Sequence, residues 1–219
     1  MNLKNLNINE FIAIDVETTG LDVYHDKIIE IAAVKFKNGK IEDLFSELIN
    51  PNQKIPRFIE NLTGICNVDV LDKPSFNVIS NDFIRFIDKY PIIGHSVSFD
   101  IDFINKELNG SYDIYNNEFI CDTYQLSKIF LYDLYSYKLQ SLCDHFSINI
   151  NKAHRAKEDA ENSGILFIKL IDIISSCSLD NFNNIYKIYS DKIILNKILF
   201  ENCIKYFIDN SILRIKERS

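Results

Sequence analysis

The sequence has no tryptophan, one methionine, four prolines and six glycines among its 219 residues. It also has no long apolar run. The most apolar stretch, residues 165–174, is interrupted by Lys169 and Asp172, and it is far shorter than the roughly 20 residues of a membrane-spanning helix. We therefore predict no membrane span. Residues 1–5 contain no apolar segment of the kind that marks a secretory signal, so we expect no such signal there.

Paired cysteines and an excess of positive charge are also missing. The five cysteines are scattered and form no C-x-x-C pair, which argues against a zinc site and against a disulfide framework and favours a reducing, cytoplasmic location. The formal net charge is −7, whereas a protein that coats nucleic acid is normally basic. An acidic chain can still bind a polyanion if metal ions supply positive charge locally.

What is present is the composition of a globular protein, with 47% hydrophobic and 25% charged residues. Three apolar, β-branched runs come first, at residues 11–16, 28–36 and 41–49. The second and third are joined by Asn38-Gly39, the strongest short hairpin signal. These three runs predict an antiparallel meander.

After Pro56 the spacing of apolar residues becomes helical and alternates with two short strand-like runs, residues 90–94 and 119–121. The predicted helices span residues 76–87 (capped by Ser75), 99–108, 139–146 and 156–174, with one more beginning at Asp122-Thr123. This order predicts an α/β fold with a mixed five-stranded sheet flanked by helices. Residues 175–219 lack glycine and proline. We divide the chain into a core, 1–174, and a C-terminal helical extension, 175–219.

Three separated segments carry the candidate chemical groups. Asp15 and Glu17 lie two residues apart at the end of the first strand, so their side chains leave the same face. Asp100 lies where the fourth strand passes into a helix, and His154 and Asp159 lie at the start of a late helix. Each has an ordinary explanation by itself: a solvated strand end, an acid stabilised by the helix dipole, or the capping and ion-pair pattern of a helix start.

In combination and in this order, Asp-x-Glu-Thr-Thr-Gly from Asp15, an Asp after a strand, and His-x-x-x-x-Asp from His154 resemble the DnaQ-like family of 3′–5′ exonucleases. The subgroup is the one with four acids and a histidine (DEDDh), and the resemblance covers residues 11–170. Segment 62–76 is similar to the linker before the family's second conserved segment, and segments 121–123 and 137–142 are similar to the family, in particular to its bacterial replicative proofreading branch. The resemblance implies an RNase H-like fold. Ser96 departs from the pattern, because the family usually has Asn there.

The resemblance implies a role for each of the five motif residues. Asp15 would bridge two divalent ions, roughly 3.5–4 Å apart. Glu17 and Asp159 would bind the ion that carries the attacking water. Asp100 would hold the second ion, and His154 would accept a proton from the water. A set of carboxylate oxygens suits Mg²⁺ or Mn²⁺ better than Zn²⁺.

The resemblance also implies that the residues after the acid pair contact the terminal nucleotide, with Leu21 as an apolar wedge beside the last base. The predicted substrate-binding residues are Thr18, Thr19, Gly20, Leu21, Ile65, His95, Ser96 and Phe99. For Phe99, packing in the core is an equally good explanation.

The sequence thus predicts a metal-dependent exonuclease that releases nucleoside monophosphates from the 3′ ends of single-stranded DNA, in replication proofreading or repair. One alternative is an RNA-trimming exonuclease, because discrimination depends on contacts to the 2′-OH that the sequence does not reveal. Another is a catalytically silent binding subunit of a replication complex. The extension could pack on the core, form a dimer contact, or dock on a polymerase or another replication protein.

Overall fold

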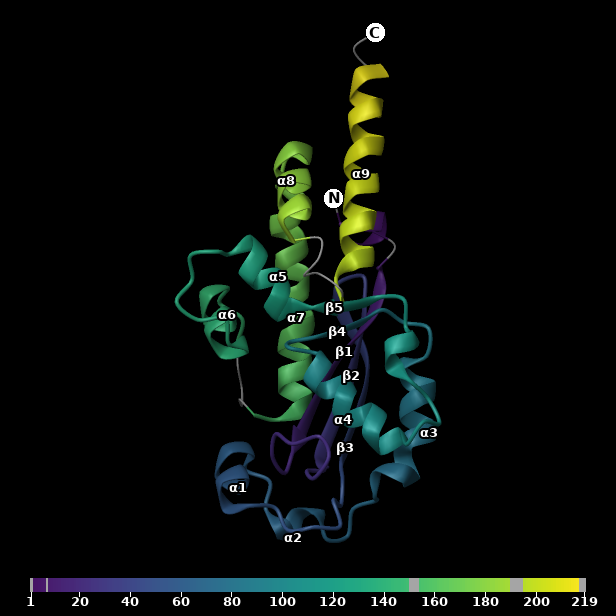
Figure 1. The fold of residues 1–219 in the computed structure, drawn as a ribbon, viewed down its shortest axis with the longest axis vertical. Coiled ribbons are helices and arrows are strands. Elements are labelled where there is room, and N and C mark those ends of the chain that lie inside the picture. The colour runs from purple at the N-terminus through teal and green to yellow at the C-terminus, as the bar shows by residue number, and fades with distance from the viewer. Residues whose placement is uncertain (1, 7, 150–153, 190–194, 217–219) are drawn as a thin grey trace.

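The computed structural model describes residues 2–6, 8–149, 154–189 and 195–216. At its centre is a five-stranded sheet in the order β3-β2-β1-β4-β5 (Figure 1). Its strands are β1 Glu10–Thr18, β2 Ile28–Lys37, β3 Lys40–Leu48, β4 Ile92–Gly94 and β5 Ile120–Asp122. The first three pair antiparallel, and β4 and β5 join parallel to β1. The predicted meander and mixed sheet are confirmed.

The hairpin between β2 and β3 forms at the predicted Asn38-Gly39 pair. Asn38 has a φ of 52° and Gly39 a φ of 74°, and two left-handed residues in succession are what a tight turn between twisted strands requires. The sequence signal therefore identifies both the position and the conformation of this turn.

Helices cover both faces of the sheet. They are α1 Arg57–Thr63, α2 Asn67–Val70, α3 Phe76–Ile87, α4 Ser98–Leu108, α5 Thr123–Phe130, α6 Leu139–His145, α7 Ala156–Ser175, α8 Leu179–Tyr189 and α9 Lys197–Lys216. Two short 3-10 helices, Leu3–Leu6 and Ile114–Asn116, complete the described elements. Ser75 occupies the N-cap position of α3, but its side chain makes no capping hydrogen bond, contrary to the prediction. Asp122 does cap α5, accepting from the N–H groups of Tyr124 and Gln125.

Alternate residues of β1 serve two different apolar clusters. Ile12, Ile14 and Val16 pack with α3 and α4 on one face. Phe11 and Ala13 pack on the other face, in the cluster that contains the buried residues of α7. Because side chains alternate along a strand, the next positions of this second series, 15 and 17, also face α7. The strand therefore directs its two acids toward the long helix.

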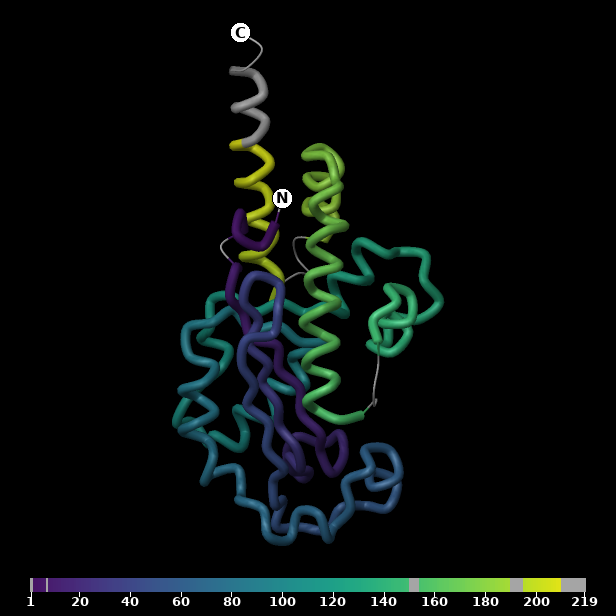
Figure 2. The backbone as a smooth tube through the Cα atoms, turned by 180° about the vertical axis from the view of Figure 1, so that it is seen from behind, coloured from purple at the N-terminus to yellow at the C-terminus, as the bar shows by residue number. Residues whose placement is uncertain are grey.

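The C-terminal helices belong to the same packing as the sheet. Phe182 of α8 and Phe200 and Cys203 of α9 are buried in the cluster that includes Phe11 and Phe167. Figure 2 shows α8 and α9 extending past the end of the sheet that lies opposite α1 and α2. Of the predicted extension, residues 190–194 and 217–219 lie outside the described residues, and a domain boundary at residue 174 stays a prediction. None of the described helices combines the length and apolar character needed to cross a bilayer.

Candidate active site

Two carboxylates at the end of β1 form one side of the site. Asp15 pairs in register with Ala32 of β2, and Glu17 pairs with Glu30. Both acids are half-buried, and both lie on the α7 face of the strand. The ladder then becomes irregular between Glu17 and Thr18, where the chain leaves the sheet.

Asp100 joins this acid pair through a backbone hydrogen bond. It lies in the first turn of α4, is 3% exposed, and accepts a hydrogen bond at Oδ1 from the N–H of Val16 at 2.9 Å. Because Val16 stands between Asp15 and Glu17, this bond fixes the Asp100 carboxylate beside the end of β1. The structure thus brings together side chains that are 85 residues apart in the sequence.

The start of α7 supplies the third part of the site. The N–H of His154 donates to Asp159 Oδ2 at 3.0 Å, and His154 itself has a left-handed backbone with φ 61°. One ligand atom from each of Glu17, His154 and Asp159 lies within 4.8 Å of the others. The late motif therefore lies beside Glu17 of β1.

Crowding of these acids makes their charged forms unfavourable. Burial, reinforced by the neighbouring carboxylates of Asp100 and Glu17, raises the pKa of Asp15 well above its usual value. Burial and then the charge of Asp159 raise the pKa of Glu17 to about 8, and burial raises the pKa of Asp100 to about 8. Burial also raises the pKa of Asp159. The cluster is an accumulation of negative charge that a cation would stabilise.

The donor set fits hard divalent cations. It offers carboxylate oxygens and a nearby imidazole, with no thiolate among the grouped residues, and oxygen-rich sets of this kind suit Mg²⁺ or Mn²⁺. Positive charge at this place would also offset the burial and the repulsion that together raise the pKa values of the acids. The identity of the metal remains an expectation from this chemistry.

A fifth carboxylate, which the sequence reasoning missed, lies against the cluster. Glu30 of β2 is 3% exposed, and its carboxylate is bound by the guanidinium of Arg155, with Nη2 2.6 Å from Oε1 and Nε 3.0 Å from Oε2. The N–H of Ala156 donates to the same Oε2 at 2.9 Å. The sequence feature that could have identified Glu30 is its position as a charged residue within the otherwise apolar run of β2.

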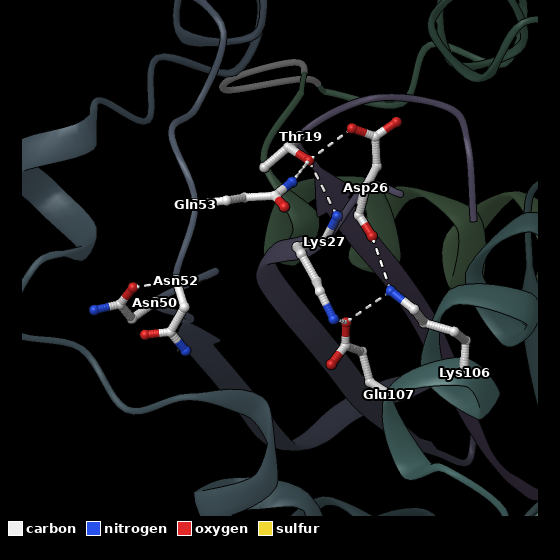
Figure 3. Close-up of polar contacts among 8 residues, drawn as sticks. All are labelled: Thr19, Asp26, Lys27, Asn50, Asn52, Gln53, Lys106 and Glu107. Atoms are coloured by element: carbon white, nitrogen blue, oxygen red, sulfur yellow. Dashed lines mark hydrogen bonds and ion pairs between the residues drawn. The ribbon is translucent and has the colours of Figure 1, made fainter. Parts of the chain in front are cut away.

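The loop between β1 and β2 is held by hydrogen bonds of Thr19 and Asp26, both within the loop and to residues outside it. The Thr19 hydroxyl donates to Asp26 Oδ1 at 2.9 Å and accepts from the N–H of Lys27 at 3.0 Å and from Gln53 Nε2 at 2.8 Å (Figure 3). Asp26 also accepts from Lys106 Nζ through its backbone carbonyl, at 3.1 Å. The Thr19 side chain, which was predicted to bind substrate, is thus engaged in shaping the loop.

The neighbouring loop residues differ in what they present to solvent. The Thr18 hydroxyl is buried and donates to the carbonyl of Gly20 at 2.6 Å. A Cβ on Gly20 would lie 2.3 Å from Asp26 Oδ2, so any larger residue there would force the Asp26 carboxylate to move. Leu21, in contrast, is 85% exposed. It is the predicted substrate residue of this loop whose side chain is freely accessible.

Of the remaining predicted substrate residues, two pack against other apolar side chains and two line a groove. Ile65 and Phe99 are the two that pack. Ile65 is buried in a small cluster with Ile29 and Ile59. Phe99 is half-buried and lies 4.8 Å, between ring centroids, from Phe103. For Phe99 the packing explanation therefore has a physical basis, and a substrate role for either side chain stays a prediction.

His95 is bound on both ring nitrogens. Nδ1 lies 2.9 Å from Thr123 Oγ1, and Nε2 lies 2.9 Å from the carbonyl oxygen of Tyr137. Burial lowers the pKa of His95 to about 4, so the ring is neutral at physiological pH. A carbonyl oxygen can only accept, so Nε2 carries the proton of the neutral ring. The Thr123 hydroxyl, which lies beside Nδ1, donates to the carbonyl oxygen of Gly94 at 3.0 Å. His95 thereby ties β4 to the segment before α6.

A groove leads away from the start of α7. Its volume is about 510 Å³, and His154, Asp159, His95 and Ser96 lie along it together with Tyr124, Lys138, Leu139 and Gln140. Ser96 has a left-handed backbone with φ 61°, and its N–H donates to Asp122 Oδ1 at 3.0 Å. The groove connects two of the five motif residues with an aromatic ring and an exposed lysine.

Comparison with known proteins gives consistent matches. A family model described as exonuclease (RNase T type) matches residues 12–167. The 3′–5′ exonuclease DinG of Bacillus subtilis is 37% identical over 169 residues, which cover 76% of this chain and 18% of DinG. The epsilon subunit of DNA polymerase III from Aquifex aeolicus is 34% identical over 171 residues, covering 77% of this chain and 83% of the subunit.

A solved structure agrees with the fold. The nuclease domain of 3′hExo, a DEDDh family member bound to rAMP, matches with a TM-score of 0.64 and 18% identity, covering 78% of this chain and 94% of that chain. The chain therefore spans less than a fifth of DinG but most of the length of the epsilon subunit and of the 3′hExo domain.

Proposed function

Because this chain belongs to the DnaQ-like exonuclease family and carries its 3′–5′ exonuclease domain, we propose that it hydrolyses the terminal phosphodiester at the 3′ end of single-stranded DNA. The product would be a nucleoside monophosphate. The observation that supports this proposal most strongly is the convergence of three distant segments, carrying Asp15, Asp100 and Asp159, at the end of β1.

Each motif residue has a part in the proposed reaction. Asp15, Glu17, Asp100 and Asp159 would hold two ions of Mg²⁺ or Mn²⁺. When bound, such ions lower the pKa of a water and neutralise negative charge on the phosphodiester. The imidazole of His154, which is exposed next to Asp159, would accept the proton of the attacking water.

The groove beside His154 is suited to the strand that precedes the scissile nucleotide. The ring of Tyr124 and the ammonium of Lys138 line it, and aromatic rings and lysines are the groups that bind single strands without strong sequence preference. Leu21 would contact the last base from the loop after β1. An RNA-trimming enzyme is the second candidate, since the 3′hExo domain, which shares the fold, is bound to rAMP.

The biological setting is inferred from relatives and from the cysteines. Similarity to an epsilon subunit and to PolC-type polymerases supports a role in replication proofreading or repair. In that role, a polymerase or another replication protein would be contacted through residues 175–219. All five cysteines are free, as a reducing compartment such as the cytoplasm would keep them.

The proposal is tested with 5′-labelled single-stranded DNA, RNA of the same sequence and a mismatched duplex, each with Mg²⁺ or with EDTA. We expect a ladder of shortened DNA products that needs Mg²⁺ and disappears in the Asp15→Ala/Glu17→Ala variant. Faster shortening of the RNA would favour the second candidate. Equal turnover by the double variant would contradict the proposed site, and absence of turnover by the wild type would leave the catalytically silent alternative.

A further inference from the structure

The pair formed by Glu30 and Arg155 has no role in the reaction proposed above, yet it touches the site from two sides. Glu30 stands directly opposite Glu17 on the neighbouring strand, and like charges in that position destabilise a sheet. Arg155 follows His154 directly in the sequence. The pair therefore joins the strand next to the acids of β1 with the helix that carries the late motif.

Glu30 fastens the first turn of α7 by three points. Its carboxylate accepts hydrogen bonds from Nε and Nη2 of Arg155, at 3.0 and 2.6 Å, and from the N–H of Ala156, at 2.9 Å. Arg155 is the N-cap residue of α7, and its own side chain caps no N–H of the helix. A carboxylate from β2 therefore supplies an acceptor for the first N–H of α7, one of those that have no partner within the helix.

The two site residues of this segment depend on its backbone for their position. His154 is exposed, and it is tied to the helix through the bond from its N–H to Asp159 Oδ2. Asp159 in turn makes one of the first helical bonds of α7, from its N–H to the carbonyl of Arg155 at 2.9 Å. Movement of Arg155 would thus move both groups.

We propose that Glu30 and Arg155 are positioning residues, which fasten the start of α7 to β2 and so hold the late motif against the acids of β1. The bidentate geometry is essential, because a fork of two parallel hydrogen bonds fixes orientation as well as distance. A lysine at position 155 would keep the charge but lose the fork. The catalytic part of this proposal rests on the proposed function, and its structural part does not.

The test compares Arg155→Lys and Glu30→Gln with Glu42→Gln as the matched control. Glu42 forms ion pairs with Lys35 and Lys37, at 3.0 and 3.3 Å, on the sheet and away from α7. Amide hydrogen exchange is measured first. We expect the N–H groups of His154 and Asp159 to exchange at least about tenfold faster in the two pair variants. The middle of α7, such as Leu166, should stay as protected as in the control.

Mn²⁺ binding and single-stranded DNA turnover are then measured for the same proteins, below their melting temperatures. We expect weaker Mn²⁺ binding and a kcat lowered about 10- to 100-fold, as displacement of reacting groups by about 1 Å produces. KM for the DNA should change less than about threefold. Glu42→Gln should behave as the wild type in all three measurements.

The outcomes distinguish the structural part of the proposal from its catalytic part. A uniform loss of protection along α7, with unchanged kcat and Mn²⁺ affinity, would show that the pair only stabilises the fold and would overturn the proposal. If the wild-type protein degrades no nucleic acid, the proposed function fails, and exchange and Mn²⁺ binding still decide whether the pair positions the segment. If Glu30→Gln does not fold, Arg155→Lys, which leaves no buried charge without a counterion, carries the test.

Discussion

At the scale of single residues, the site is governed by the cost of gathering negative charge. Burial, reinforced by neighbouring carboxylates, raises the pKa values of Asp15, Glu17 and Asp100. The sequence can predict these residues because the motif places the reactive types at short, recognisable spacings. It cannot predict that the Thr19 hydroxyl donates a hydrogen bond to Asp26, because hydrogen-bond partners across a loop depend on the backbone conformation of the folded loop.

The raised pKa values make the metal-free protein sensitive to pH. A folded acid with a pKa near 8 keeps a proton that the unfolded chain has lost above about pH 4.5, so the free energy of unfolding falls as pH rises through that window. In EDTA we expect Tm to decrease between about pH 5 and pH 8, and millimolar Mg²⁺ to raise Tm at pH 8.

The variant Asp15→Asn provides the control for this prediction. It removes one charge from the cluster, so its Tm in EDTA at pH 8 should exceed that of the wild type, and Mg²⁺ should raise it little. Thermal unfolding followed by circular dichroism at several pH values gives both quantities. A wild-type Tm independent of pH and Mg²⁺, or an equal Mg²⁺ response in the variant, would refute the explanation.

At the scale of elements, the site depends on how a loop and a helix start are fastened. The loop after β1 is organised around Asp26, whose carboxylate also accepts from the N–H of Asp22 at 2.9 Å, and α7 is fastened by Glu30. Strands and helices are predictable from periodicity, since burial repeats along each element. The roles of the Asp26 and Glu30 carboxylates cannot be predicted in this way. Asp26 binds residues of an irregular loop, and Glu30 binds the start of a distant helix.

Gly20→Ala tests the loop. The new Cβ would lie 2.3 Å from Asp26 Oδ2, so the carboxylate must move and the bonds to Thr19 and Asp22 weaken. We expect a loss of about 1–3 kcal/mol in the free energy of unfolding and, since Leu21 follows directly, a raised KM for single-stranded DNA. Denaturant unfolding and steady-state kinetics measure these effects.

The double variant Gly20→Ala/Asp26→Ala identifies the cause. If the clash with the carboxylate is responsible, the double variant should be no less stable than Asp26→Ala alone. Full additivity of the two single losses would show that Gly20 is required for another reason.

At the scale of the whole molecule, the C-terminal helices support the edge of the sheet next to the site. Asn196 is fully buried, and its Oδ1 accepts from the N–H of Asp122 at 3.0 Å across 74 residues of sequence. Asp122 also binds the N–H of Ser96, so the chain of contacts runs from the extension to β4. The composition of residues 175–219 predicts helices, but a contact at this separation leaves no local pattern.

Asn196→Ala measures this support. It leaves the buried N–H of Asp122 without an acceptor, which should cost about 1–3 kcal/mol in the free energy of unfolding. Asn202→Ala is the matched control, because Asn202 of α9 donates from Nδ2 to the carbonyl of Leu6 at 3.0 Å from a half-buried position. An equal, small loss in both variants would show that the extension contributes little to the sheet edge.

The measurement that tests the central claim most directly is the number of Mn²⁺ ions bound per chain, determined by isothermal titration in the presence of a nucleoside monophosphate. If the four acids form one metal site of the proposed kind, the wild type should bind two ions, and Asp15→Asn, which alters the acid proposed to bridge them, should bind fewer and more weakly. Absence of binding in the wild type, or the same stoichiometry and affinity in Asp15→Asn, would contradict the account.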